Sequence, residues 1–227
     1  MKKIFFLLLL PLLACAQPTP KTVLDTNQLI EVLRFVASDL TEGRRTGTEG
    51  NRIAREYLVT RFQEMGVEPF EGDFTHSFDF ENRRSKEKMK GINVIAQVKG
   101  EIDSMIVVSA HYDHLGIRDS LIFNGADDDA SGTAAVLNMA AYFAKEKPKH
   151  TLVFALFDAE EMGLQGARAF VSDSVLLQKI KLNINLDMIA QNDSSEIYAA
   201  GTYHYPKTKA ILEGIERSEE HTSELQS

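Results

Sequence analysis

Three apolar segments of this sequence end directly in acidic or histidine residues, and this pattern constrains the fold more than any other feature. Residues 105–110 continue into HYDH, residues 151–157 into DAEE, and residues 181–186 into Asp187. Short apolar runs bounded by polar residues are typical of buried strands. The pattern therefore predicts three buried strands whose carboxyl ends carry clusters of charged side chains.

Segments with helical spacing separate these predicted strands. Apolar residues recur at helical intervals over 27–40, 51–65, 131–145 and 163–172, and Gly66 stands where a glycine commonly ends a helix. A loop is predicted at 41–50, an edge strand at 74–80 and a further strand at 93–98. Alternation of strands and helices predicts an α/β protein, a three-layer α/β/α sandwich with a mostly parallel central sheet. Ligands of such sheets bind beyond the carboxyl ends of the strands.

The residues at those strand ends are of the types that bind divalent metals. The stretch NGADDD, residues 124–129, adds three more carboxylates just before a predicted helix. Carboxylates that lie close together raise each other's pKa, and a divalent cation removes this penalty. Histidine combined with several Asp and Glu residues suits zinc, and two zinc ions that share one carboxylate suit hydrolysis.

Four motifs resemble those of the M28 family of zinc aminopeptidases. SAHYDHLG, NGADDDASGTAAV, FDAEEMGL and NLDM occur in the family's order and at similar spacing, and the resemblance extends from residue 33 to residue 187. It implies a metallopeptidase that hydrolyses N-terminal peptide bonds of substrates with a free N-terminus. The catalyst would be a water molecule activated by two zinc ions.

The resemblance also implies a role for each matching residue. His111 and Asp187 would bind one zinc ion, Glu161 would bind the other, and Asp128 would bridge both. Glu160 would be the general base, and Asp113 would orient His111. The family's fifth ligand is a histidine further downstream, for which no motif is found before residue 217. The second zinc ion would therefore keep only Asp128 and Glu161.

Other polar residues near these motifs have structural interpretations. Asp127 and Asp129 precede a predicted helix and are expected to cap it. Asp158 is expected to be structural or to support the metal ligands from outside the site. His114 matches no ligand position of the family, so it is interpreted as a satisfied polar residue or as part of the pocket wall.

Two further residues invite a functional interpretation. His204 follows the NLDM motif too soon to match the missing ligand, so it is not assigned to the metal site. Arg44 is expected in a structured loop, with substrate contact as the alternative.

The two ends of the chain are predicted to lie outside the catalytic domain. Lys2 and Lys3 precede an apolar run that is too short to span a bilayer, so residues 1–16 predict an export signal. Cys15 stands at a lipobox position, which predicts a lipid-anchored protein at the outer surface or in the periplasm. Cleavage before Gln17 would instead release a soluble secreted protein.

The last residues, 217–227, read RSEEHTSELQS and resemble the translation of a sequencing-library adapter. They are predicted to be non-native, and His221 is therefore not considered a functional residue. The catalytic domain is predicted to comprise residues 17–216 and to lack its C-terminal part.

Composition and charge exclude one class of partner and leave other functions open. The net charge is −8 and no basic cluster occurs, which argues against nucleic acid as a partner. One alternative is an acyltransferase similar to glutaminyl cyclases, which would use a single zinc ion on the same scaffold. Others are a carboxypeptidase of the same superfamily and an inactive, truncated binding domain without metals. Zinc stoichiometry and activity on N-blocked peptides would separate these functions.

Overall fold

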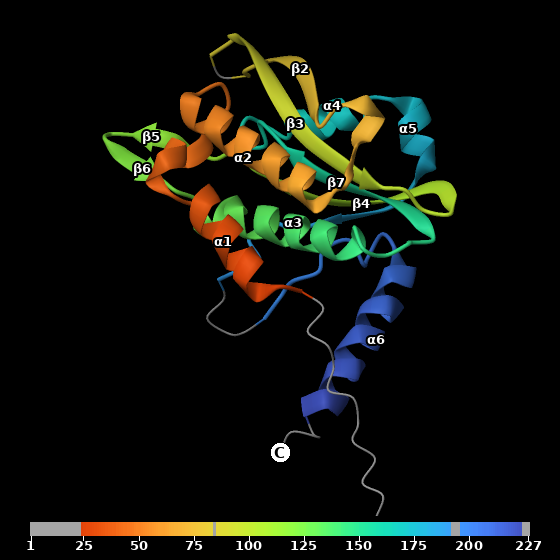
Figure 1. Ribbon diagram of the computed structural model, residues 1–227. Coiled ribbons are helices and arrows are strands. Elements are labelled where there is room, and N and C mark those ends of the chain that lie inside the picture. Colours follow the sequence, from red (N-terminus) through yellow and green to blue (C-terminus); the bar gives the residue numbers. More distant parts are fainter. Residues whose placement is uncertain (1–23, 84, 192–195, 224–227) are drawn as a thin grey trace, which may run out of the picture.

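A six-stranded sheet forms the centre of the protein (Figure 1). The computed structural model describes residues 24–83, 85–191 and 196–223. The strand order is β1-β3-β7-β4-β8, with β2 also paired to β3. These strands are β1 (Glu68–Pro69), β2 (Thr75–Glu81), β3 (Lys88–Val98), β4 (Ile102–His111), β7 (His150–Phe157) and β8 (Ile180–Asn185).

Of the six strands described, β3 alone runs against the others. It pairs antiparallel with β1, β2 and β7, whereas β4 is parallel to both β7 and β8. The predicted mostly parallel direction therefore holds for five of these strands, and the apolar run of β3 does not reveal its opposite direction. The predicted burial holds for most of β4 and β7 but is wrong for β8, which is exposed after Ile180 because it is the edge strand of the described sheet. Because β7, β4 and β8 are parallel neighbours, their carboxyl ends lie at one edge of the sheet.

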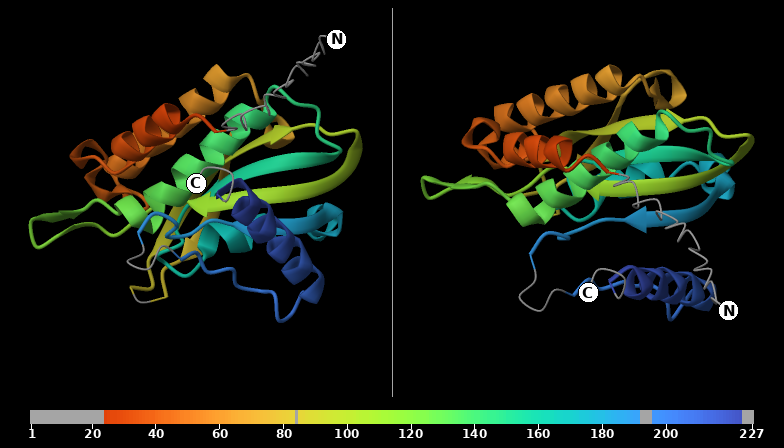
Figure 2. Two further views of the ribbon diagram at one scale, coloured as in Figure 1. Left: turned by 90° about the horizontal axis from the view of Figure 1, so that it is seen from below. Right: turned by 60° about the horizontal axis from the view of Figure 1, so that its bottom comes forward.

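Helices cover both faces of the sheet, which confirms the predicted three-layer α/β/α sandwich (Figures 1 and 2). On one face lie α1 (Thr26–Val36), α2 (Glu49–Met65) and α3 (Gly132–Phe143), and on the other lie α4 (Gln165–Phe170) and α5 (Ser174–Lys179). Strand β7 contributes side chains to the apolar clusters on both faces of the sheet, because successive side chains of a strand point to opposite faces. Phe154 and Leu156 belong to the first apolar cluster, whereas Val153 and Ala155 belong to the second.

Local signals in the sequence fix several helix ends. The Asp25 carboxylate accepts hydrogen bonds from two backbone N–H groups of the first turn of α1. The Thr48 hydroxyl accepts a hydrogen bond from the Asn51 N–H at the start of α2. Gly66 ends α2 in the left-handed conformation (φ 71°), as predicted.

The first helix ends earlier than predicted, at Val36. The 3₁₀ element η1 (Asp39–Arg44) follows it, and Glu42, Gly43 and Arg44 all have positive φ. This left-handed run turns the chain sharply, so that Leu40, predicted to lie on the buried face of the helix, is 68% exposed. The same turn directs Arg44 into the interior, where its side chain is fully buried.

Several elements have no counterpart in the prediction. Strands β5 (Gly116–Arg118) and β6 (Leu121–Phe123) form a hairpin that projects from the body, and α6 (Pro206–Ser223) lies apart from the sheet (Figures 1 and 2). No helix within the described ranges is both long and apolar enough to cross a membrane. The predicted export signal and Cys15 fall outside the described residues.

Candidate metal centre

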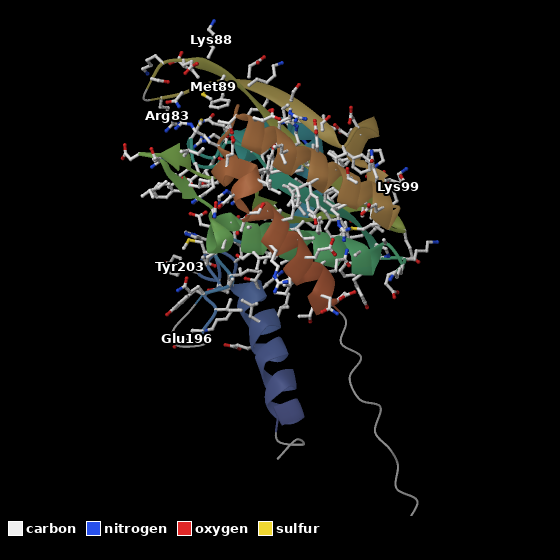
Figure 3. All side chains as sticks on the ribbon, turned by 60° about the vertical axis from the view of Figure 1, so that its left-hand side comes forward. Arg83, Lys88, Met89, Lys99, Glu196 and Tyr203 are labelled. Atoms are coloured by element: carbon white, nitrogen blue, oxygen red, sulfur yellow. The ribbon has the colours of Figure 1, made fainter. Side chains whose placement is uncertain are left out.

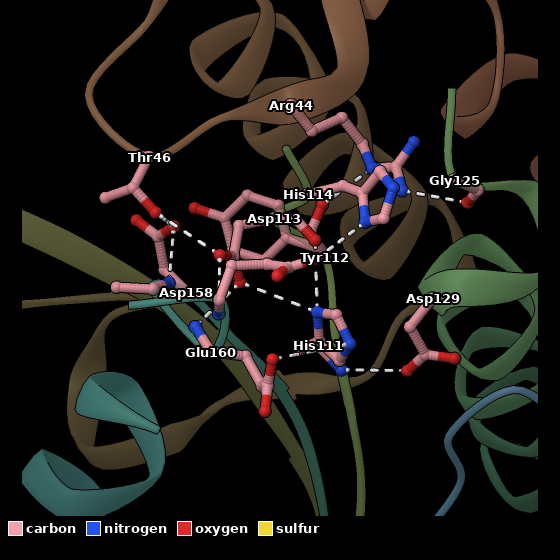
Figure 4. Close-up of polar contacts among 12 residues, drawn as sticks. Arg44, Thr46, His111, Tyr112, Asp113, His114, Gly125, Asp129, Asp158 and Glu160 are labelled. Carbon is pink, nitrogen blue, oxygen red and sulfur yellow. Dashed lines mark hydrogen bonds and ion pairs between the residues drawn. The ribbon is translucent and has the colours of Figure 1, made fainter. Parts of the chain in front are cut away.

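Chemically reactive side chains gather where β4, β7 and β8 end. His111 is the last residue of β4, Glu160 and Glu161 follow β7, and Asp187 follows β8. Asp128 comes from η3 (Ala126–Ser131), the irregular turn that precedes α3. The structure therefore brings together the side chains that the sequence motifs single out. Figure 4 labels His111 and Glu160 among them.

His111, Asp128 and Asp187 form a first group of possible metal ligands. One ligand-type atom of each residue lies within 4.8 Å of those of the other two. Nε2 of His111 is 3.0 Å from Oδ1 of Asp128 and 4.0 Å from Oδ1 of Asp187. These separations fit atoms that surround one ion, because zinc holds N and O ligands at about 2.0–2.2 Å.

His114, Asp128 and Glu161 form a second such group. Nδ1 of His114 lies 2.8 Å from Oε1 of Glu161 and 3.8 Å from Oδ2 of Asp128. The Asp128 carboxylate thus belongs to both groups, with Oδ1 near His111 and Oδ2 near His114. A carboxylate in this position is suited to bridge two metal ions.

The sequence interpretation of His114 is a satisfied polar residue or part of the pocket wall, and the structure places it in the second group, where Nδ1 forms an ion pair with Glu161 if the ring is protonated. Nδ1 of His114 is buried and has no hydrogen-bond partner of normal geometry within the described residues. Sequence reasoning missed this residue because only the family's ligand pattern was used to assign ligands. The second group therefore contains three ligand-type residues, where the sequence predicted only Asp128 and Glu161.

The imidazole of His111 is oriented through its second nitrogen. Nδ1 lies 3.0 Å from the main-chain oxygen of Asp113, and a carbonyl oxygen can only accept, so Nδ1 is the donor. Nε2 is thereby left facing Asp128 and Asp187. The sequence assigned this orienting role to Asp113, and the nearer contact comes from its backbone, since its carboxylate Oδ1 is 3.6 Å away.

The Asp113 carboxylate is fully buried and ties β4 to the loop after β7. Its Oδ1 accepts a hydrogen bond from the Glu160 N–H at 2.9 Å, and its Oδ2 accepts one from the Glu161 N–H at 3.3 Å. These two bonds fix the backbone on which Glu160 and Glu161 stand (Figure 4).

Asp158 has the structural contacts that the sequence interpretation anticipates. Its buried carboxylate accepts hydrogen bonds from the Thr46 hydroxyl (2.8 Å), the Asn51 side-chain amide (3.1 Å) and the Ile92 N–H (2.9 Å). Burial, together with the charge of Asp113, raises the pKa of Asp158 to about 6. The residue links the loop between η1 and α2, helix α2 and strand β3.

Asp129 connects three segments of the centre. Its Oδ1 accepts hydrogen bonds from the N–H groups of Gly132 (3.0 Å) and Met188 (3.3 Å), and its Oδ2 accepts one from the His111 N–H (3.1 Å). The bond to the Gly132 N–H, at the start of α3, confirms the predicted helix cap for Asp129. The other two bonds connect this cap to the segments that carry His111 and Asp187. A cis peptide bond joins Asp129 to Asp128.

Asp127 does not cap the helix, contrary to the prediction. Its carboxylate accepts a hydrogen bond from the Ala190 N–H at 2.9 Å, in the loop after β8. The sequence placed both residues before the helix, but only the backbone path of η3 decides which carboxylate reaches the helical N–H groups.

Arg44 is the largest fully buried side chain of the described chain and binds main-chain oxygens only. Its guanidinium donates hydrogen bonds to the carbonyl oxygens of Val36, Tyr112, Asn124, Gly125 and Asp128. The prediction of a structured loop is confirmed, and the alternative of a substrate contact is not favoured by this burial. The residue holds the turn that carries Asp128 against the segment after β4.

The electrostatics of the centre favour an added cation. Burial alone would lower the pKa of His111, but the hydrogen bond and charge of Asp113, with Asp129 and Glu160, raise it to about 10. The pKa of Glu160 is also raised. Burial is the main cause and the neighbouring carboxylates add to it, whereas the charge of His111 opposes the shift. Positive charge is thus stabilised at this position. The donor set of His, Asp and Glu fits zinc, and the unpartnered nitrogen of His114 supports this fit.

A cavity of about 160 Å³ opens beside His111, Glu160 and Asp187. Apolar side chains form part of its wall, and polar side chains of β4 and β8 form the rest. The wall consists of Ser109, Ala110, Phe157, Leu164, Ala167, Asn183 and Asn185. The candidate metal centre thus borders a space with both apolar and polar walls.

His204 lies away from the centre. It is exposed, contacts only the ring of the neighbouring Tyr203 among the aromatic contacts of the described chain, and belongs to neither ligand group. Tyr203 itself is 90% exposed at the surface (Figure 3).

Residues 93–226 match the model of peptidase family M28. The chain is also similar to a probable zinc metalloprotease of Pyrenophora tritici-repentis, with 33% identity over 165 residues, covering 65% of this chain and 36% of that protein. It spans 17% of a vacuolar membrane protease of Schizophyllum commune at 28% identity. The chain therefore covers a minor part of these curated relatives.

Solved structures share the fold at low sequence identity. A glutaminyl cyclase of Porphyromonas gingivalis matches with a TM-score of 0.62 and 20% identity, over 74% of this chain and 62% of that one. A leucine aminopeptidase precursor of Bacteroides thetaiotaomicron matches with a TM-score of 0.61 and 18% identity, over 75% and 64% of the two chains. The family match contains every predicted site residue, and the prediction that 217–227 is non-native stays a prediction.

Proposed function

Because this chain belongs to peptidase family M28, we propose that it is the catalytic part of a two-zinc aminopeptidase. The observation that carries the proposal is the position of the Asp128 carboxylate, which is shared by two groups of ligand-type side chains. One zinc ion would be held by His111, Asp128 and Asp187, and the other by Asp128 and Glu161. Bound zinc supplies a Lewis acid that polarises a carbonyl group and makes water more acidic.

Glu160 is the proposed general base. Its carboxylate reaches toward the centre, with Oε2 4.0 Å from Nε2 of His111, and its side chain is 31% exposed. Burial and neighbouring carboxylates raise its pKa, which increases its affinity for a proton taken from water. Asp113 fixes the backbone N–H of Glu160 and so holds the base in place.

The preference for a free N-terminus is proposed from the charges around the centre. Six carboxylates surround the centre: Asp113, Asp128, Asp129, Glu160, Glu161 and Asp187. Burial raises the pKa of Asp129 to about 7, so this group carries only part of a charge near neutral pH. Carboxylates that the zinc ions leave unneutralised would favour the α-ammonium group of a peptide. The adjoining cavity would receive part of the substrate next to the scissile bond.

The resemblance to glutaminyl cyclases of known structure supports a second candidate, a single-zinc acyltransferase. The two functions differ in product and in metal content. A cyclase would convert N-terminal glutamine into a pyroglutamyl group and leave other peptides intact. The two ligand groups that share Asp128 favour the peptidase.

The test combines metal content with three substrates. We expect about two zinc ions per chain, release of the N-terminal residue from a free peptide, and no reaction with the N-acetylated peptide. Hydrolysis of the acetylated peptide at its C-terminus would favour a carboxypeptidase. A single zinc ion with cyclisation of a glutaminyl peptide would show that the chain is a cyclase.

A further inference from the structure

We infer that His114 is a direct ligand of the second zinc ion and completes a three-residue site with Asp128 and Glu161. The inference rests on the proposed zinc function and adds to it, because His114 occupies no ligand position of the family pattern. Three observations on the imidazole ring support it: a buried nitrogen without a hydrogen bond of normal geometry in the described chain, two carboxylates close to that nitrogen, and a backbone that restrains the ring.

The first observation is the buried nitrogen. The side chain of His114 is only 9% exposed, and its Nδ1 has no hydrogen-bond partner of normal geometry in the part of the chain that the structure describes. A buried polar atom without a partner is costly to a fold and calls for a specific explanation. Coordination of a cation would satisfy this nitrogen.

The second observation concerns the neighbours of that nitrogen. Oε1 of Glu161 lies 2.8 Å away, and the two groups form an ion pair when the imidazole is protonated. Ligand atoms of one tetrahedral zinc ion with bonds of about 2.0–2.2 Å lie about 3.3–3.6 Å apart, so these two atoms would separate by about 0.5–0.8 Å to hold the ion. The nearest oxygen of Asp128 is 3.8 Å from the same nitrogen. Nitrogen and oxygens thus lie around a common point within the spacing of a metal site.

The third observation is that the backbone fixes the ring. Gly125 has φ 53°, and a Cβ atom there would lie 2.6–2.7 Å from ring carbons of His114, so a glycine is required beside the imidazole. Arg44 donates a hydrogen bond to the Gly125 carbonyl (3.0 Å), and the His114 N–H donates to the Arg44 carbonyl (3.4 Å). Figure 4 shows these three residues side by side. The ring is therefore held with Nδ1 toward the carboxylates, as a preorganised ligand would be.

The main competing role is that His114 only positions Glu161. A residue that orients a metal ligand without touching the metal typically changes metal affinity by about 10–100-fold when removed. Loss of one of three protein ligands should exceed that range, because zinc sites normally have at least three of them. Metal affinity and metal spectroscopy therefore separate the two roles without reference to catalytic activity.

The first experiment compares His114→Ala with His150→Ala in the full chain. His150 starts β7, at the opposite end from the centre, and is hydrogen-bonded to Ser104, so it is a matched control. Zinc content is measured by mass spectrometry after dialysis, and affinities by competition with a chelator. We expect two zinc ions in the wild type and the control, and one in His114→Ala. The affinity of the lost site should fall by more than about 100-fold, beyond the range of an indirect partner.

The second experiment replaces His114 by another ligand type. In His114→Cys loaded with Co²⁺, a thiolate bound to the metal produces a charge-transfer absorption that a distant thiol does not. The wild type carries Cys15 and is the blank for this absorption. This variant also decides the question if His114→Ala does not fold, as judged by circular dichroism.

The outcomes distinguish the inference from the proposed function. One zinc ion in His114→Ala and a thiolate–cobalt absorption in His114→Cys would support the inference. Two zinc ions in a folded His114→Ala, or no such absorption in a folded and cobalt-loaded His114→Cys, would overturn it and leave the zinc aminopeptidase intact. A wild-type chain with no zinc and no peptidase activity would overturn the proposed function as well.

Discussion

Backbone contacts of single side chains hold most of the candidate metal centre together. The Asp113 carboxylate binds the N–H groups of Glu160 and Glu161, and the Asp129 carboxylate binds three N–H groups from separate segments. The Arg44 guanidinium in turn donates hydrogen bonds to main-chain carbonyl oxygens of separate segments. Because buried polar groups are costly when unpaired, each of these residues is a connector whose removal exposes several backbone groups at once.

Replacement of Glu160 tests the proposed base. In Glu160→Gln the amide keeps the size of the side chain but cannot take up a proton at neutral pH. We expect zinc binding to be kept and turnover to fall by about 10²–10⁴-fold, the typical contribution of a general base. The measurement is kcat with an aminoacyl substrate, together with zinc content. Near-normal turnover by the metal-loaded variant would show that another group takes the proton.

Replacement of Asp129 tests its role as a connector. Asp129→Ala leaves three backbone N–H groups without their acceptor. The control, Asp127→Ala, leaves one N–H group without its acceptor. At about 1–3 kcal/mol for each unsatisfied buried group, we expect Asp129→Ala to lower the free energy of unfolding by at least about 3 kcal/mol. Urea unfolding in the presence of a chelator measures this without a contribution from zinc. Equal losses in the two variants would contradict the assignment.

At the scale of elements, irregular turns shape the centre as much as the helices and strands do. Element η3 places Asp128 between the two ligand groups, and η1 delivers Arg44 to the interior. Hairpin β5–β6 packs directly on η1, at Gly43. A change in η1 should therefore reach the metal centre through Arg44.

Two glycines with similar φ allow this to be tested. Gly43 (φ 67°) and Gly66 (φ 71°) are both left-handed, but a Cβ at Gly43 would meet the Phe123 oxygen and, at 2.9 Å, the Gly116 oxygen of the hairpin, while Gly66 has nothing within 4 Å. Gly66→Ala should cost about 1–2 kcal/mol of stability from the left-handed conformation alone. Gly43→Ala should cost a further ~1–3 kcal/mol from overpacking.

Thermal or denaturant unfolding compares the two variants, and zinc affinity is the second measurement. We expect weaker zinc binding in Gly43→Ala only, because Gly43 precedes Arg44, which binds the turn that carries Asp128, whereas a Cβ at Gly66 meets nothing within 4 Å. Similar stability and zinc affinity in both variants would show that the hairpin moves away from the added Cβ without loss of stability.

At the scale of the whole molecule, the centre joins segments that are distant in the chain. Its ligand-type residues end β4, follow β4, β7 and β8, or belong to η3, so a bound ion would link the sheet to the turn before α3. Without an ion, the clustered carboxylates repel each other. Metal binding and folding stability are therefore expected to be coupled.

Removal of zinc tests this coupling. A ligand that binds only the folded state stabilises it by about 2.7 kcal/mol at a concentration 100-fold above Kd. We expect a chelator to lower the melting temperature of the wild type and to have little effect on Asp128→Ala, which lacks the shared carboxylate. Calorimetry with and without zinc is the measurement. An unchanged melting temperature in the wild type would mean that the site does not bind zinc under these conditions.

The sequence by itself determined the α/β class, the order of most elements and the residues that gather at the strand ends. This information is local: apolar periodicity, capping residues and motifs of a few residues are read within short stretches of chain. Only the tertiary structure decided the direction of β3, the end of α1, the different roles of Asp127 and Asp129, and the unpartnered nitrogen of His114. Arg44 gives the physical reason, because its hydrogen-bond acceptors lie between 8 and 84 positions away along the chain. Contacts between such distant backbone atoms leave no periodic pattern in a single sequence and exist only once the layers have packed.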